Sequence, residues 1–130
     1  VTQTNRFKAA VTQASLSNMH SDWGTCDTGT TFDNDQFGGP PFDDPSLYLE
    51  RSAINHVRNV STPLLILHSE ADYRCTMEQA EQFYTALKWL GKEVAFVRFP
   101  NESHGLFRKG QPRHAVEWVS LMLGWFDKYL

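Results

Sequence analysis

Cysteine is scarce in this chain, with only Cys26 and Cys75 among 130 residues. Small extracellular domains that rely on disulfides usually carry more cysteines in a shorter sequence. We therefore expect two free thiols in a reducing, cytoplasmic compartment, and a bond between Cys26 and Cys75 is the alternative. The C-x-x-C spacing of structural zinc sites is missing as well. We expect neither a metal nor a cofactor.

Long apolar runs and clustered positive charge are also absent. The longest apolar run, Pro63–Leu67, is far too short to cross a membrane. The net charge is −3, and no basic patch or stripe is present for a polyanion to bind. No charged-then-apolar leader is visible at the start of the sequence. We therefore expect neither a nucleic-acid partner nor a membrane partner.

The residues that are present suit one folded domain. Hydrophobic residues make up 41% of the chain, which is enough for a packed core. Strand patterns occur in the segments Phe7–Ala14, Leu64–His68 and Glu93–Phe99. Helix patterns occur in the segments Asp44–Ala53, Thr76–Leu90 and Pro112–Tyr129. This alternation predicts an α/β fold in which crossover helices join parallel strands.

Local signals predict where the helices begin and end. Thr76 and Gln79 have the spacing of a capping box, and Gly91 is placed to end the helix that they begin. The final helix is apolar or aromatic except for one narrow polar stripe, so we expect most of it to be buried.

The Ser15–Pro45 segment is rich in Gly, Asp, Asn, Thr and Pro, which predicts a long loop packed onto a surface by its aromatic residues.

Two loops follow strands at the edge where parallel sheets collect their functional groups. The first, His68–Arg74, contains Asp72, and the second, Asn101–Gly105, contains His104. Because one crossover helix separates them, neighbouring strands would bring the two side chains within reach of each other. A carboxylate that fixes the tautomer of an imidazole leaves its other nitrogen free to take a proton from a hydroxyl nucleophile. We predict that Asp72 and His104 form a catalytic acid–histidine pair.

Each of the two residues also has a plainer interpretation. Asp72 is placed to cap the following helix or to order the turn, and His104 is consistent with an ordinary loop histidine. His68 ends a buried strand and is expected to bond a backbone group. We expect Glu70 and Glu102 to be solvated or to lie behind the site. No partner is evident for the remaining histidines, His20, His56 and His114.

Two further patterns match known sites only in part. Asp27-Thr28-Gly29 matches the tripeptide of aspartic proteases, but that chemistry needs two carboxylates that share a proton and an all-β scaffold. Asp33-Asn34-Asp35 begins like a calcium loop but lacks the glycine and the distal glutamate of that motif. We expect neither to act as a site, and the second to be a polar turn.

A serine nucleophile is missing from the sequence. No G-x-S-x-G pattern occurs, and no serine lies on a glycine-flanked elbow between a strand and a helix. The acid nevertheless precedes the histidine, as in the nucleophile–acid–histidine order of α/β-hydrolases. The sequence therefore predicts two members of a triad without the third.

Four stretches, taken together, are specific enough to suggest a family: Asn5–Val11, Pro63–Arg74, Glu78–Lys88 and Val97–Gly105. They resemble the prolyl oligopeptidase family, and most closely its acylaminoacyl-peptidase branch. The resemblance covers essentially the whole chain. It implies that residues 1–130 are the C-terminal part of an α/β-hydrolase catalytic domain, with Asp72 as the triad acid and His104 as the triad base. Thr76 departs from the family pattern, where proline is usual.

The resemblance also implies properties of the intact protein. The serine elbow, the oxyanion hole and a β-propeller would lie upstream of Val1. The intact protein would hydrolyse peptides through an acyl-enzyme, whereas this chain alone would be inactive. An exposed apolar edge along Phe7–Val11 would favour self-association. Two alternatives remain open: an esterase or dienelactone-hydrolase-like enzyme on the same fold, and a non-catalytic interaction module on that scaffold.

Overall fold

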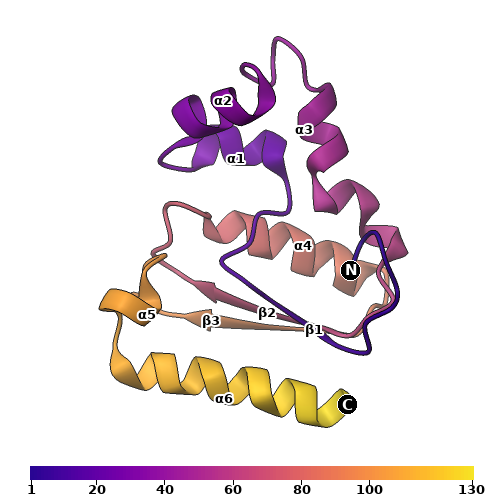
Figure 1. The fold of residues 1–130 in the computed structure, drawn as a ribbon, viewed down its shortest axis with the longest axis vertical. Helices are drawn as coiled ribbons and strands as arrows, with labels where there is room; N and C mark the ends of the chain where they lie inside the picture. The colour runs from indigo at the N-terminus through magenta and orange to yellow at the C-terminus, as the bar shows by residue number, and fades with distance from the viewer.

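The structure is a computed structural model that describes all 130 residues. Its sheet has three parallel strands, in the order β1 (Ala10–Gln13), β2 (Leu64–Ser69) and β3 (Val94–Phe99). Helix α4 (Met77–Trp89) connects β2 to β3 and lies over one face of the sheet, while α6 (Pro112–Tyr129) lies over the other face (Figure 1). The predicted α/β fold with parallel strands and crossover helices is confirmed.

Strand β2 is central because it is apolar on both faces. All six of its residues are buried, as a parallel strand between two helical layers requires. Its first residue, Leu64, is paired in register with Ala10 of β1 and with Val94 of β3. Strand β1 has only 4 residues and is shorter than predicted. The chain leaves the extended conformation at Ala14, whose φ is 43°, and Phe7 lies exposed outside the sheet.

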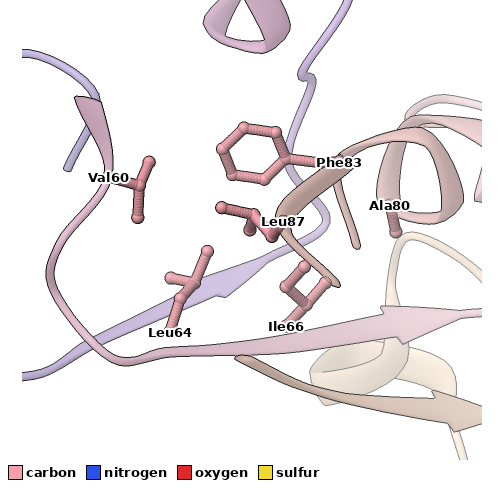
Figure 2. Packing of buried hydrophobic residues seen from close by; sticks show 6 residues of the cluster. All are labelled: Val60, Leu64, Ile66, Ala80, Phe83 and Leu87. Carbon is pink, nitrogen blue, oxygen red and sulfur yellow. The ribbon is translucent and has the colours of Figure 1, made fainter. Parts of the chain in front are cut away.

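Two apolar clusters join the helices to the sheet. The cluster between β2 and α4 consists of Val60, Leu64, Ile66, Ala80, Phe83 and Leu87 (Figure 2). The cluster on the opposite face, toward α6, consists of Leu65, Leu67, Phe99, Leu106 and Trp118. Successive residues of β2 point to opposite faces of the sheet and therefore contribute alternately to the two clusters. Burial of this apolar surface, at about 25 cal/mol per Å², is the main force that holds the layers together.

Helix α4 has nearly the predicted bounds, but its start differs from the prediction. Thr76 makes no side-chain capping bond, so the predicted capping box is wrong. Gln79 is instead fully buried, and its Oε1 accepts the backbone N–H groups of Ser17 (2.9 Å) and Asn18 (2.8 Å). These bonds attach the chain that follows β1 to α4. Gly91, with a φ of 66°, ends the helix as predicted.

The Ser15–Pro45 segment is not the irregular loop that its composition predicts. It contains three short helical elements, α1 (Met19–Thr25), the π-helical turn η1 (Gly29–Asp33) and α2 (Asn34–Phe37). With α3 (Ser46–Arg51) they form a layer on the outer side of α4, and the 3₁₀ helix η2 (Ala53–Asn59) leads back to the sheet (Figure 1). The predicted aromatic packing is found only in part. Phe37 lies 4.3 Å from Tyr48 and Trp23 lies 5.4 Å from Phe42 between ring centroids, but Phe32 and Phe42 are exposed.

Helix α6 has the predicted bounds, but the prediction that most of it is buried is wrong. Only His114 and Trp118 are buried, while Val116, Val119 and Leu123 are exposed. One side of the helix packs on the sheet, and the apolar residues on the other side find no partner within the chain. None of the helices combines the length and the apolar character that crossing a membrane needs.

We expect the Leu87→Ala substitution to destabilise the layer between α4 and the sheet. Leu87 is fully buried in the cluster of Figure 2, so its truncation leaves a cavity and lowers the free energy of unfolding by about 2–5 kcal/mol. Urea denaturation followed by circular dichroism measures the change. Leu123→Ala is the matched control because Leu123 is 59% exposed, and equal losses in the two variants would contradict this packing.

Candidate active site

The loops that follow β2 and β3 leave the sheet side by side. Ser69 and Phe99, the last residues of the two strands, are paired in register. Beyond them, the Glu70 N–H donates to the Phe99 carbonyl (2.9 Å) and the Ala71 N–H donates to the Glu102 carbonyl (2.8 Å). Both loops lie at the same end of the sheet (Figure 1). Backbone hydrogen bonds therefore continue the pairing of the strands into the loops.

Asp72 is buried in the turn between β2 and α4, with only 2% of its surface exposed. Its Oδ1 accepts the backbone N–H groups of Arg74 (3.0 Å) and Cys75 (2.9 Å). Its Oδ2 lies 3.0 Å from Nδ1 of His104. The sequence offers two roles for Asp72, ordering the turn or contacting His104. In the structure its side chain does both.

His104 lies between Asp72 and a pocket. Its side chain is 42% exposed; Nδ1 faces Asp72, and Nε2 makes no hydrogen bond within the chain. The ring helps to line a pocket of about 330 Å³ whose other residues are Gln13, Ala14, Ser69, Leu106, Phe107 and Trp118. An imidazole that donates its Nδ1 proton to a fixed carboxylate can accept a proton at Nε2 from a hydroxyl group placed in such a pocket.

A second acid–histidine pair lies buried behind the His104 loop. Oε1 of Glu102 is 2.6 Å from Nδ1 of His114 and accepts the Gln111 N–H at 3.0 Å. Burial alone would raise the pKa of Glu102, but these two hydrogen bonds outweigh it and hold the pKa below its usual value of 4.5. The expectation that His114 lacks a partner is therefore wrong. Of the two positions predicted for Glu102, solvated or behind the site, the structure shows the second, because Glu102 is buried.

The other residues singled out in the sequence have structural partners. Nε2 of His68 lies 2.7 Å from the Cys75 carbonyl, which confirms the predicted bond to a backbone group. Glu70 forms an ion pair with Arg98 (2.8 Å). Asp27, from the tripeptide that resembles an aspartic protease, forms an ion pair with Arg74 (2.6 Å). An exposed pair of this kind does not supply the shared proton that aspartic-protease chemistry needs.

Asp72, Cys75 and His104 place three possible metal-binding atoms within 4.8 Å of one another. The Asp72 carboxylate already has its backbone donors and His104 as partners. Burial, together with the neighbouring carboxylate of Asp72, raises the pKa of the Cys75 thiol to about 12, so this thiol is protonated at neutral pH. Asp72 is thus fully partnered by the backbone and by His104, and the protonated thiol of Cys75 offers no thiolate ligand. Both Cys75 and Cys26 are free thiols.

No serine hydroxyl of this chain completes the pair. Ser69 is buried at the end of β2, and Oγ of Ser103 accepts the N–H of Gly105 at 3.3 Å. Neither forms a hydrogen bond with His104. The site therefore holds an acid and an imidazole in contact, with an open Nε2 and no nucleophile.

Comparison with known proteins assigns the whole chain to one family. Residues 1–130 match the sequence model described as the prolyl oligopeptidase family. The chain belongs to the prolyl oligopeptidase family. This confirms the resemblance inferred from the sequence.

Relatives within the prolyl oligopeptidase family match along the full chain. "Uncharacterized peptidase YuxL" of Bacillus subtilis (strain 168) is 50% identical over 130 residues, which are 100% of this chain and 20% of that protein. The structure of an acylaminoacyl peptidase from Pyrococcus horikoshii superposes with a TM-score of 0.94 at 35% identity, over 99% of this chain and 21% of that one. A puromycin-hydrolysing peptidase from Mycobacterium tuberculosis gives a TM-score of 0.83 at 28% identity, over 99% and 19%. The chain thus spans about a fifth of the length of these relatives.

We expect Glu102→Gln to weaken the fold and to change its response to acid. Because the folded pKa lies below the unfolded value of 4.5, the contribution of Glu102 is complete above that value and is lost as the pH falls through the folded pKa. Glutamine keeps the shape but not the charge, which costs about 1–3 kcal/mol near neutral pH. Thermal unfolding from neutral pH down to about pH 3 measures both effects. The control is Glu117→Gln, an exposed position, and wild-type behaviour of Glu102→Gln over this range would exclude the role.

Proposed function

We propose that the full-length protein carrying this chain is a serine peptidase that hydrolyses peptides through an acyl-enzyme. Asp72 is the acid of its triad and His104 is the base. The observation that carries the proposal is the 3.0 Å contact between Oδ2 of Asp72 and Nδ1 of His104, at the carboxyl ends of adjacent parallel strands. Membership of the prolyl oligopeptidase family supports it. The nucleophile is expected outside residues 1–130, since the chain spans only about 20% of its relatives.

In the proposed reaction, Nε2 of His104 takes the proton of the nucleophile's hydroxyl group as its oxygen attacks the peptide carbonyl carbon. Asp72 stabilises the resulting imidazolium, because two backbone N–H groups prevent its carboxylate from turning away. The imidazolium then gives its proton to the leaving amine, and the acyl group stays on the nucleophile. His104 next takes a proton from water as the water oxygen attacks the acyl carbon. The bond between this carbon and the oxygen of the nucleophile then breaks, the imidazolium returns its proton to that oxygen, and the acid product leaves.

The substrate class we propose is peptides, cleaved by an oligopeptidase or an acylaminoacyl-type exopeptidase. One similar structure is named an acylaminoacyl peptidase and another a puromycin-hydrolysing peptidase. These names favour peptide substrates over the ester substrates of other enzymes that share the fold. Comparing hydrolysis of acylated peptides with that of peptides with a free N-terminus distinguishes the two types of peptidase.

We expect His104→Ala in the full-length protein to slow covalent labelling by a fluorophosphonate probe by roughly 10⁴-fold or more, because the hydroxyl nucleophile loses its base. Asp72→Asn is expected to slow labelling by roughly 10⁴-fold, since it removes the charge that stabilises the imidazolium. The labelling rate is measured by gel fluorescence over time. His56→Ala is the control, because His56 is half-buried in η2 and its ring makes one hydrogen bond, to the Glu50 carbonyl. Undiminished labelling of His104→Ala would exclude the triad assignment.

We also propose that the 130-residue chain on its own self-associates. Strand β1 pairs only with β2, so its other edge presents unpaired backbone groups to a second chain. Light scattering is therefore expected to give a mass that rises with protein concentration. The N–H groups of Ala10 and Ala14 donate toward β2, so the N–H of Val11 faces the open edge. Val11→Pro removes this donor without breaking a bond to β2 and is expected to reduce the mass. A constant monomeric mass across the concentration range would contradict the proposal.

A further inference from the structure

Two buried carboxylates and a thiol meet where α1 packs against η1, and the proposed reaction uses none of them. Asp22 on α1 is 1% exposed, and Asp33 at the end of η1 is 3% exposed. Cys26 is the residue at which α1 ends. The possible ligand atoms of Asp22, Cys26 and Asp33 all lie within 4.8 Å of one another.

The protein leaves both carboxylates without adequate partners. Oδ1 of Asp22 and Oδ2 of Asp33 are buried and accept no hydrogen bond. Neither residue takes part in an ion pair with a basic side chain. Burial, together with the adjacent Asp33 carboxylate, raises the pKa of Asp22 to about 7, and burial also raises the pKa of Asp33. Buried carboxylates are normally paired, protonated or bound to a metal ion.

The other two buried carboxylates described above, Asp72 and Glu102, each have several hydrogen-bond partners. Asp72 accepts two backbone N–H groups and faces His104. Glu102 accepts the Gln111 N–H and faces His114. Asp22 and Asp33 differ from these two acids because neither of them faces a histidine or another basic side chain.

The backbone is built to bring the three residues together. At Gly29, the first residue of η1, an added Cβ would collide with the backbone carbonyl of Trp23. Only glycine therefore allows η1 to pass directly against α1. This close approach turns the chain back and places Asp33 beside Asp22 and Cys26.

We propose that Asp22, Cys26 and Asp33 form a binding site for a zinc-type divalent cation. Zn²⁺ accepts thiolate and carboxylate ligands together, whereas Mg²⁺ and Ca²⁺ prefer sites made entirely of oxygen. Neighbouring ligand atoms of a tetrahedral zinc site lie roughly 3.5 Å apart, so small side-chain rotations close the cluster around an ion. The cation supplies the positive charge that both carboxylates lack.

A cation at this site would also fix the residue that follows Cys26. The Asp27 N–H donates to the Tyr73 carbonyl (2.8 Å), and the Asp27 carboxylate pairs with Arg74 (2.6 Å). Tyr73 and Arg74 belong to the turn that contains Asp72. The site is thus structural, and it stabilises the contact between the α1–η1 segment and that turn.

Zn²⁺ binding to the full-length protein tests the proposal. After treatment with a chelator, equilibrium dialysis against Zn²⁺ is expected to show a tight zinc site in the wild type that is roughly tenfold or more weaker in Asp22→Asn and in Asp33→Asn. Asp35→Asn, at an exposed position on α2, is the matched control and is expected to bind like the wild type. Equal zinc binding by the wild type and all three variants would overturn the proposal.

Co²⁺ used as a probe reports on the thiol directly. The wild type and Asp35→Asn are expected to show the charge-transfer absorption of a thiolate bound to cobalt, and Cys26→Ser is expected to lose it. Circular dichroism verifies that each variant is folded. If zinc leaves the melting temperature of the wild type unchanged, while Asp22→Asn raises it in the presence of chelator, the two carboxyl groups share a proton instead and the proposal is wrong.

Discussion

The Asp72 carboxylate organises the end of the sheet on which the proposed chemistry depends. On one side it accepts the N–H groups of Arg74 and Cys75, and on the other it faces His104. Burying a charge in this way is unfavourable, and hydrogen bonds to the ionised form offset the loss of water. One side chain therefore determines both the path of the turn and the orientation of the imidazole. A change that reoriented the turn would disturb the histidine as well.

Sequence patterns predict those parts of the fold that depend on periodic burial. The helices α4 and α6 repeat apolar residues at helical spacing, because each packs one face against the sheet. The β2 strand is a continuous apolar run, because helices cover both faces of the sheet at this strand. The same patterns miss α1, η1 and α2, whose short helices depend on the Gln79 bonds to Ser17 and Asn18 and on the close approach at Gly29. The exposed side of α6 is mispredicted because an apolar residue does not reveal whether a neighbour covers it.

In the candidate site, too, the sequence predicts some contacts and misses others. Asp72 and His104 can be predicted to meet because both follow strands of a parallel sheet, and the order of the strands determines where their loops lie. Glu102 meets His114, and Asp22 meets Asp33, through turns whose paths no spacing rule describes. For that reason the sequence points to the exposed histidine and overlooks the buried one.

The backbone bonds from Glu70 to Phe99 and from Ala71 to Glu102 have a consequence for motion. They join the two loops, so we expect thermal fluctuations to displace Asp72 and His104 together. We therefore expect the acid and the imidazole to move as one unit, so that the distance from Nε2 to an incoming hydroxyl group varies more than the distance between the two side chains. Proton transfer at this site would then be limited by the positioning of the nucleophile.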